Sequence, residues 1–335
     1  MDTSFKVMQW NICSDDNPMT GIKRYEDELF NNSQYLINVE RIKRTSFKRS
    51  YWMDILKFKS NNSDIIHATF QTLAPLKIVK RPTNFVLTVH DIIPYYYNTN
   101  KKIKSMWYLL RYTIPKADKI ITDSTFTKNE LIYKLNVDKN KIEVVPLGVS
   151  DAYKPLNKEE CKNHFDLDHN KKYVLIVSSI ESWKNMSLVN KIIEHSTNYT
   201  FIKIGYNQNL NNSKIINLGH IDESNMPFIY NACDLFLHTS LYEGFGLPIL
   251  EAMACGCPVV SSNAASIPEV MKNAGILLDA KDTEDNAKEF AWNIYNVFSN
   301  ETLKAKLITL GLNRAKELSW MQTVKKTVDV YKQLV

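Results

Sequence analysis

The chain has 335 residues, five cysteines, and 42 Lys and Arg against 36 Asp and Glu. This length predicts two domains rather than one compact core, and no apolar run is long enough to cross a bilayer. The N-terminus lacks the charged and apolar regions of a signal peptide, so we expect a cytoplasmic protein.

The charge is uneven along the chain, and the cysteines are scattered. Residues 1–165 carry 26 Lys and Arg against 18 Asp and Glu, whereas residues 166–335 carry 16 against 18. A basic first half favours an anionic partner. The odd number and irregular spacing of the cysteines indicate neither disulfides nor zinc, and we interpret them as buried thiols.

The first half predicts alternating strands and helices, a pattern typical of a parallel sheet covered by helices. We expect strands at residues 5–12, 63–70, 84–94 and 142–147 and a helix after Gly21. Residues 118–131 predict a further strand, a turn and a helix with a cap at Ser124 or Thr125. His67 and His90 end the second and third of these strands, at the edge where open α/β sheets bind ligands. A lone histidine is more often structural, and that alternative is stronger for His67.

Two basic segments carry aromatic residues. Residues 40–59 contain seven Lys or Arg interleaved with aromatic side chains, and residues 101–116 form a basic amphipathic helix. The apolar face of that helix would consist of Ile103, Met106, Trp107, Leu110 and Ile114. Such segments fit an anionic membrane surface, or a helix docked on its own domain with solvated lysines outside. No nucleic-acid-binding motif is present.

The second half begins after a polar linker, residues 148–172. This linker contains Asp166 and Asp168, the spacing of a DxD metal motif, but no apolar strand precedes them, so we expect no metal site. Further strands are expected at 173–178, 201–206 and 214–221, and Lys184 lies in the loop after the first of them.

Residues 234–262, DLFLHTSLYEGFGLPILEAMACGCPVVSS, predict a strand, a loop, a helix and a second strand. Pro248 suits the first turn of a helix that begins near Gly246 or Leu247, and Gly256 suits its end. Gly244 and Gly246 flank Phe245, so the backbone of this loop can approach a ligand closely. The first N–H groups of the helix favour an anion at the carboxyl end of the strand.

Two carboxylates lie on either side of this anion site, Glu243 in the loop and Glu251, which we expect in the first turn of the helix, with seven residues between them. Neither carboxylate should contact phosphate, because like charges repel, so both are interpreted as acceptors for sugar hydroxyls. The predicted ligand is therefore a nucleotide sugar. The alternative is a tight turn that carries glutamates by chance.

This stretch closely resembles the signature of the retaining glycosyltransferases of family 4, which have the GT-B fold. The resemblance implies an α/β architecture of two Rossmann-like domains that face each other across a cleft. It is strong over residues 173–335 and looser before them. We expect an N-terminal domain at 1–165, which takes the acceptor and is joined by a crossing helix at 320–335, and a donor-binding domain at 166–319.

The same resemblance implies a role for each site residue. Glu243 would hold the transferred sugar, Glu251 the ribose and Lys184 the diphosphate, and His90 would contact the sugar. The remaining donor contacts would come from backbone or loop positions. These are Gly21 (or a simple turn glycine), Gly205, Ile221, Gly244, Phe245, Gly246 and Leu247.

Many relatives carry an arginine near this lysine, where this chain has Ser179 and Trp183. A helix N-terminus supplies about half a positive charge, and Lys184 supplies one more. A departing nucleoside diphosphate carries at least two negative charges, so another cation or a different loop geometry must make up the difference.

The expected reaction transfers a hexose from a GDP- or UDP-linked donor to a glycan or lipid-linked acceptor, in polysaccharide or glycolipid assembly, without metal or cofactor. The alternatives are a catalytically silent scaffold protein of the same fold and a sugar-nucleotide epimerase. A dinucleotide-dependent dehydrogenase is disfavoured, because the only GxG, in GFGLPI, has Ile249 at the third glycine position.

Overall fold

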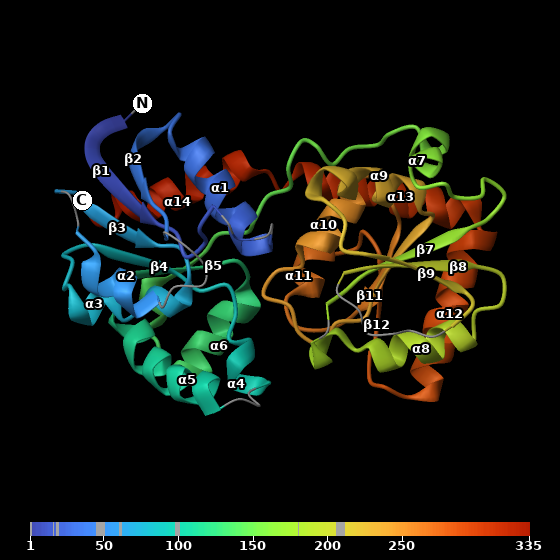
Figure 1. Cartoon of the computed structure of the whole chain (residues 1–335), viewed down its shortest axis with the longest axis horizontal. Helices are drawn as coiled ribbons and strands as arrows, with labels where there is room; N and C mark the ends of the chain where they lie inside the picture. Colours follow the sequence, from blue (N-terminus) through green and yellow to red (C-terminus); the bar gives the residue numbers. More distant parts are fainter. Residues whose placement is uncertain are drawn as a thin grey trace. The chain divides into compact units, whose positions relative to one another are not determined.

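The computed structural model describes residues 2–15, 17, 20–44, 51–59, 62–97, 101–179, 181–205 and 212–335, with only the backbone of residues 2, 3, 51 and 101–104. The chain divides into two compact units, Met1–Gly148 with Ser319–Val335, and Val149–Leu318. Each unit is a parallel six-stranded sheet with helices packed on it (Figure 1). Part of the basic segment at 40–59, residues 45–50, lies outside the described residues.

The first unit has the strand order β2-β1-β3-β4-β5-β6. Its strands are β1 (Asp2–Trp10), β2 (Ile37–Ile42), β3 (Ile65–Ala68), β4 (Phe85–Thr88), β5 (Lys119–Thr122) and β6 (Ile142–Val144). Its helices are α1 (Gly21–Ser33), α2 (Tyr51–Lys57), α3 (Leu76–Val79), α4 (Ile93–Tyr96), α5 (Lys101–Thr113), α6 (Thr125–Leu135) and α14 (Trp320–Lys332), with 3-10 turns η1 (Gln71–Leu73), η2 (Ile114–Lys116) and η3 (Lys139–Lys141). Every residue of β3 and β4 is buried, as in a sheet covered on both faces.

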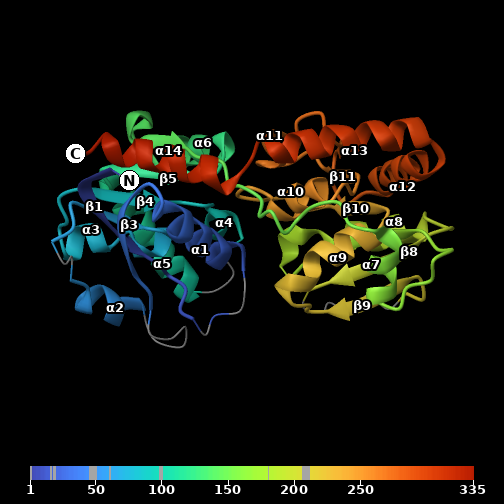
Figure 2. The same cartoon turned by 90° about the horizontal axis from the view of Figure 1, so that it is seen from above.

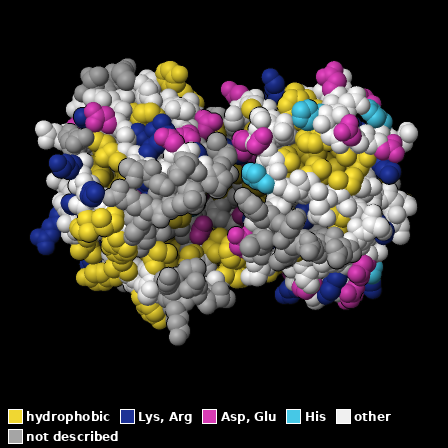
Figure 3. All heavy atoms as spheres, viewed as in Figure 1, with side chains coloured by type: hydrophobic (Ala, Val, Ile, Leu, Met, Phe, Trp, Pro, Cys, Tyr) yellow, Lys and Arg dark blue, Asp and Glu magenta, His cyan; other side chains and the backbone are white. Residues whose placement is uncertain are grey.

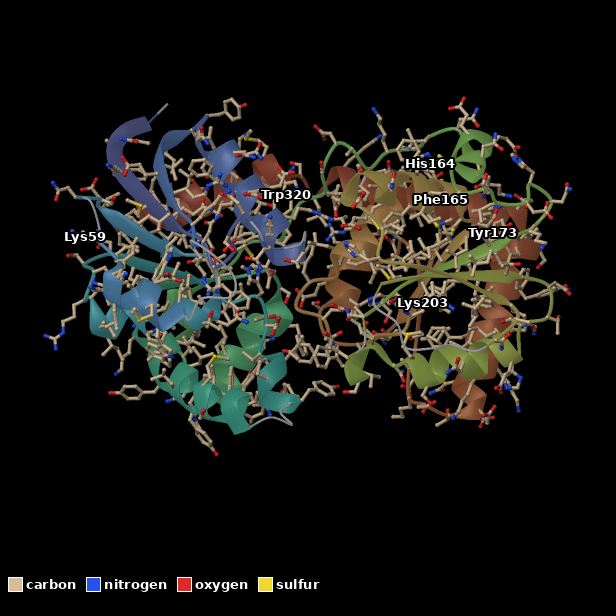
Figure 4. The ribbon with its side chains drawn as sticks, viewed as in Figure 1. Lys59, His164, Phe165, Tyr173, Lys203 and Trp320 are labelled. Atoms are coloured by element: carbon tan, nitrogen blue, oxygen red, sulfur yellow. The ribbon has the colours of Figure 1, made fainter. Side chains whose placement is uncertain are left out.

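The C-terminal helix α14 belongs to the first unit and lies beside α1 (Figures 1 and 2). The Thr323 hydroxyl donates to the Pro146 carbonyl at 2.8 Å, and Tyr331 Oη lies 2.7 Å from His67 Nδ1. Gly148 is required where the chain passes the start of this helix, since a Cβ there would lie 2.1 Å from the backbone nitrogen of Trp320, labelled in Figure 4.

The second unit has the strand order β12-β11-β10-β7-β8-β9. Its strands are β7 (Tyr173–Val177), β8 (Thr200–Ile204), β9 (Ile215–Gly219), β10 (Leu235–His238), β11 (Val259–Ser262) and β12 (Ile276–Leu278). Its helices are α7 (Lys158–His164), α8 (Met186–Glu194), α9 (Met226–Ala232), α10 (Leu247–Ala254), α11 (Ile267–Met271), α12 (Glu284–Ser299) and α13 (Glu301–Lys316), with η4 (Ser182–Lys184) and η5 (Glu223–Asn225).

The expected domain boundary at residue 165 is too late, because residues 149–165 pack on the second unit. The Tyr153 hydroxyl donates to Glu223 at 2.6 Å, and Lys158 forms an ion pair with Asp234. His164 stacks on Phe228 with 4.9 Å between ring centroids. Figure 4 shows His164 and Phe165 together at the end of α7. A polar composition does not distinguish such a packed segment from a linker.

Two further features of the first unit bear on the predictions. Strand β2 was not predicted; its last three residues, 40–42, begin the segment that we interpreted only as basic, and it pairs with β1 at the edge of the sheet. The apolar face of α5 is buried in the unit's own core through Trp107, Leu110 and, in the turn that follows, Ile114. None of the helices in the described part of the chain combines the length and apolar character needed to cross a bilayer.

Candidate active site

The site lies where the strand order of the second sheet reverses. From β7 the chain builds β8 and β9 on one side and then returns to build β10 on the other, so the loops after β7 and β10 are neighbours. The Leu241 N–H donates to the Trp183 carbonyl at 2.7 Å, and the Thr239 hydroxyl donates to the Lys184 carbonyl at 3.1 Å. The two loops therefore hold each other in place.

The loop after β10 leads directly into α10. Gly246 is the N-cap residue and has φ = 110°, a conformation that side chains rarely adopt. The Ser266 hydroxyl lies 2.9 Å from the carbonyl oxygens of both Glu243 and Phe245, which fixes the loop. The predicted start of this helix and the position of Pro248 in its first turn are confirmed.

The end of α10 also follows the prediction. Gly256 has φ = 72°, and its N–H donates to the Met253 carbonyl at 3.1 Å. The next N–H, that of Cys257, donates to the Ala252 carbonyl at 2.9 Å. These two bonds form a Schellman motif, for which glycine is the favoured residue.

The first turn of α10 contains backbone N–H groups without a hydrogen-bond acceptor among the described residues. Within the described residues, the N–H groups of Gly246 and Leu247 make no hydrogen bond, whereas Ile249 N–H already donates to the Gly246 carbonyl at 3.1 Å. Unpaired N–H groups at a helix N-terminus carry partial positive charge and favour an anion.

Three ionisable side chains meet beside this turn. Lys184 Nζ lies 2.7 Å from Glu243 Oε1, and His238 Nε2 lies 3.2 Å from the same oxygen. His238 is the last residue of β10 and is buried. Burial alone would raise the pKa of Glu243, but the charge of Lys184 and the hydrogen bond from His238 lower it well below its usual range. Glu243 is therefore a carboxylate.

Glu251 is the fifth residue of α10, so the expectation that it lies in the first turn is wrong. The helix begins at Leu247, which carries this side chain into the second turn. Glu251 is only 3% exposed and accepts a hydrogen bond of 3.0 Å from the Tyr230 hydroxyl. The same carboxylate and burial raise the pKa of Tyr230, so this hydroxyl stays a donor.

Gly205 and Ile221 follow β8 and β9. Gly205 has φ = 109°, and a Cβ there would lie 2.0 Å from the Ser178 carbonyl oxygen, so glycine is required by the protein's own backbone. Ile221 is partly exposed. Figure 4 shows Lys203 inside the second unit, where burial lowers its pKa and Nζ lies 3.5 Å from the Gly205 carbonyl.

The predicted site residues of the first unit, Gly21 and His90, lie in the segments that follow strands β1 and β4. Gly21 is the first residue of α1, behind the Thr20 cap. His90 follows β4, with Nδ1 2.6 Å from Asp123 Oδ2 and Nε2 3.1 Å from the Thr69 carbonyl oxygen. With Asp123 ionised, both partners are acceptors and both ring nitrogens donate. Burial alone would lower the pKa of His90, but the Asp123 charge raises it above the ordinary value.

His67 has a structural role. Its Nδ1 lies 2.7 Å from Tyr331 Oη and its Nε2 lies 2.8 Å from Thr88 Oγ1, which also contacts Tyr25 Oη at 2.8 Å. Complete burial lowers the pKa of His67 to about 3, so the ring is neutral. The network fastens α14 to the sheet, in agreement with the structural alternative.

Sequence reasoning missed His238, Tyr230, Ser266 and Asp123. His238 carried the same signal as His90, since both histidines stand at the carboxyl end of a predicted strand. The other three residues contact the site from distant positions, which no local pattern indicates. Asp166 and Asp168 are exposed, and the described residues contain no group of three His, Cys, Asp or Glu that could hold a metal ion.

Comparison with known proteins places this site in a family. The model of "Glycosyl transferases group 1" matches residues 157–313, and that of "Glycosyltransferase Family 4" matches residues 24–153. The O-antigen chain mannosyltransferase B of Escherichia coli is 27% identical, over 95% of this chain and 97% of its own length.

Two solved structures share the fold at low identity. A sucrose-phosphate synthase from Thermosynechococcus elongatus has a TM-score of 0.83 at 16% identity, over 98% of this chain and 99% of its own. The Anabaena protein HepE in complex with UDP-glucose has a TM-score of 0.77 at 18% identity, over 98% and 100%. With the two family matches, which together span most of the sequence, they show that this chain belongs to the group 1 glycosyltransferases of family 4 and has the GT-B fold.

Proposed function

We propose that this glycosyltransferase moves a hexose, with retention of anomeric configuration, from a nucleoside-diphosphate sugar to a glycan or lipid-linked acceptor. The reaction would serve cell-surface polysaccharide or glycolipid assembly. The observation that carries this proposal is the cluster of Lys184, Glu243 and His238 beside the open N–H groups at the start of α10. Cationic and carboxylate groups at one turn suit a ligand with both diphosphate and hydroxyl groups.

Each group of the cluster has a role in this proposal. The N–H groups of Gly246 and Leu247 would receive the diphosphate, and Lys184 would turn from Glu243 to a phosphate oxygen. Glu243 would then accept hydrogen bonds from the sugar hydroxyls, and Glu251, held by Tyr230, from the ribose. Gly205, Ile221, Gly244 and Phe245 would line the donor, and Gly21 would approach it from its own loop.

In the proposed reaction, the bond between the anomeric carbon and the diphosphate oxygen breaks, and a bond to the acceptor oxygen forms on the same face. The proton of the acceptor hydroxyl would pass to the departing diphosphate. Donors positioned where charge develops stabilise this leaving group, so the protein's own groups would serve without a metal. For His90 we propose a contact from Nε2–H to a sugar hydroxyl, in exchange for the Thr69 carbonyl.

The relatives guide the choice of donor. The Escherichia coli relative that matches over 95% of this chain is named a mannosyltransferase, and one structural neighbour was solved with UDP-glucose. We therefore propose mannose as the first sugar to test, with a GDP- or UDP-linked donor.

A thermal-shift panel of UDP, GDP, ADP and dTDP tests nucleotide binding, followed by transfer assays with the sugar form of the best ligand. We expect one nucleotide to raise the melting temperature of the parent and to do so much less in Lys184→Met. Lys191→Met is the control, since Lys191 pairs with Asp282 on the surface of the same unit. A parent that binds none of the nucleotides would contradict the proposed function, and binding without transfer would favour the scaffold alternative.

We further propose that the first unit contacts an anionic membrane surface on the cytoplasmic side. Figure 3 shows hydrophobic side chains gathered over the α2 and α3 region of this unit. The exposed large hydrophobic residues there and on α5 are Trp52, Met53, Leu56, Ile78, Val79, Tyr108 and Tyr112. Exposed aromatic groups next to cations such as Arg111 and Lys116 fit a lipid headgroup layer.

Sedimentation with vesicles that contain anionic lipid tests this contact. Changing Tyr108 and Tyr112 to Ser, or removing Lys101, Lys102 and Lys104, should reduce the bound fraction at low salt. Trp292→Ser is the control, because Trp292 is 62% exposed on the second unit. Parent protein that does not sediment with these vesicles at low salt would contradict the contact.

A further inference from the structure

The donor site has too little positive charge if Lys184 must neutralise both Glu243 and the diphosphate of the donor. In the structure, Lys184 neutralises Glu243 at 2.7 Å. In the proposed function, on which this inference rests, the same ammonium turns to a diphosphate that carries two negative charges. Glu243 would then remain as a largely buried carboxylate without its ion pair, and such a group is costly. Either a new cation must appear beside Glu243, or the donor binds weakly.

His238 is placed to become that cation. Its Nε2 contacts Glu243 Oε1 at 3.2 Å, and its Nδ1 lies 3.3 Å from Ser261 Oγ on the neighbouring strand β11. A neutral ring can donate from Nε2 and accept from the Ser261 hydroxyl at Nδ1. A protonated ring donates from both nitrogens, and the hydroxyl turns to accept. The same two partners therefore serve both protonation states without movement of heavy atoms.

We infer that His238 takes up a proton when the donor binds, and so replaces Lys184 as the positive partner of Glu243. His238 is a positioning residue, because it acts on the donor through the carboxylate that holds the sugar. The proton comes from solvent and no bond of the donor changes. The site then contains a second full positive charge in addition to Lys184, against the two negative charges of the diphosphate.

Among the described residues, no further charged side chain contacts His238. Its own strand contributes the Phe236 ring, with 5.9 Å between centroids, and β11 contributes the Ser261 hydroxyl. The charged groups that face it are Glu243 from the loop and, through Glu243, Lys184 from η4. Since the bound state holds one more proton than the free state, donor affinity must rise as the pH falls.

Calorimetry of the full chain can count this proton. An intact nucleotide sugar, GDP-mannose or UDP-glucose according to the panel, is titrated at pH 7.5 without acceptor. The intact donor is used because its diphosphate is a diester without a titration near neutral pH, whereas free UDP and GDP have one. The observed enthalpy is measured in phosphate, HEPES and Tris, whose ionisation enthalpies differ, and the slope gives the number of protons taken up.

His238→Gln is the informative variant, since an amide N–H near the position of Nε2 still donates to Glu243 but cannot gain a proton. His195→Gln is the matched control, because His195 also contacts a carboxylate, Glu284 at 2.9 Å, on the surface of the same unit. Should His238→Gln not fold, Ser261→Ala tests the same point, because it removes the acceptor that the protonated Nδ1 requires.

We expect the parent and His195→Gln to take up between about 0.3 and 1 proton per donor, and His238→Gln to take up none. The affinity of the parent should rise up to tenfold per pH unit on acidification, and that of His238→Gln should stay nearly constant. A parent that binds the donor without proton uptake would overturn the inference alone, as would an unchanged uptake in His238→Gln or Ser261→Ala. A parent that binds no nucleotide sugar would overturn the proposed function and the inference together.

Discussion

Each unit of the protein carries a histidine paired with a carboxylate at the carboxyl end of its sheet, and the two pairs differ at the second ring nitrogen. In the first unit, His90 contacts Asp123 and a backbone carbonyl, so both partners are acceptors. In the second unit, His238 contacts Glu243 and the hydroxyl of Ser261. With Asp123 ionised, only a protonated His90 ring makes both of its hydrogen bonds. The His238 ring makes both of its hydrogen bonds in either protonation state.

The partner of the second ring nitrogen therefore decides whether the protonation state of a histidine–carboxylate pair is fixed or can change. His90 and Asp123 form a closed ion pair inside one unit. Glu243 is shared between His238 and Lys184, so its ion pairing can change when a ligand arrives. We therefore expect substitutions in the first pair to act mainly on stability and those in the second mainly on donor binding.

The largest expected effect is on the stability of the first unit. Asp123→Ala leaves a buried His90 without its counter-charge and should cost about 3 kcal/mol of unfolding free energy. Asp123→Asn should cost less, because the amide can donate to a neutral Nδ1 while Nε2–H keeps the Thr69 carbonyl. Chemical denaturation of both variants, with Glu243→Gln for comparison, measures this. Equal unfolding free energies for Asp123→Ala and Glu243→Gln would contradict the distinction between the two pairs.

A loss of activity is expected next, at Lys184. Lys184→Met should lower kcat/KM for sugar transfer by at least about 100-fold, a typical loss for one group that stabilises developing charge. Its stability should fall less than that of Asp123→Ala, because Lys184 is partly exposed and His238 remains beside Glu243 to become its positive partner. Steady-state kinetics beside Lys191→Met gives the comparison. Similar kcat/KM values for the two variants would contradict the role of Lys184.

The affinity for nucleotide should change through Glu251. Glu251→Ala removes the carboxylate proposed to hold the ribose and should weaken UDP or GDP binding about tenfold, the equivalent of one charge-assisted hydrogen bond. Tyr230→Phe, which removes only the hydroxyl that contacts Glu251 at 3.0 Å, should have a smaller effect. Calorimetry measures the affinity of each variant for UDP or GDP. An unchanged affinity in Glu251→Ala would contradict the proposed contact between Glu251 and the ribose.

The smallest effect concerns pH and a third histidine. The folded-state pKa of His67, about 3, lies below its ordinary value of 6.5, so its contribution to stability is complete above 6.5 and declines as the pH falls. From pH 7 to 5.5 this decline amounts to about 1 kcal/mol. His90 has a raised pKa, so its contribution is present at low pH and is lost as the pH rises.

Unfolding curves of the parent and His67→Gln at these two pH values test the sign. The variant should lose about 1 kcal/mol less than the parent on acidification, although it is less stable at pH 7. A parallel pH dependence of the two proteins would show that His67 is not held neutral.

The sequence predicted the second unit better than the first, for physical reasons. Strand β10, the glycine loop and α10 follow one another without a gap, so local patterns of apolar, glycine and proline residues suffice to place them. Strand β2 (INVERI) lies at an edge, and its two charged residues, Glu40 and Arg41, are adjacent, which hides its alternation. The boundary at Gly148 depends on packing between segments far apart in sequence, such as Lys158 with Asp234.

The candidate site shows the same limit. Lys184 and Glu243 were predicted as neighbours of one ligand, and their direct contact is a consequence of the strand order. The expectation for Glu251 was wrong, because a helix that begins at Leu247 has this residue at its fifth position, already in the second turn. The second partners of His90 and His238, a backbone carbonyl and a serine from another strand, leave no local signal.

The central claim is that the donor diphosphate draws Lys184 away from Glu243. A crystal structure with an intact nucleotide sugar measures this directly, through the distances from Lys184 Nζ to the nearest phosphate oxygen and to Glu243 Oε1. Our account predicts a hydrogen bond of about 2.8 Å to phosphate and a broken contact with Glu243, whose carboxylate accepts from the sugar. A complex in which Lys184 remains paired with Glu243, or in which the diphosphate lies away from the start of α10, would contradict the account.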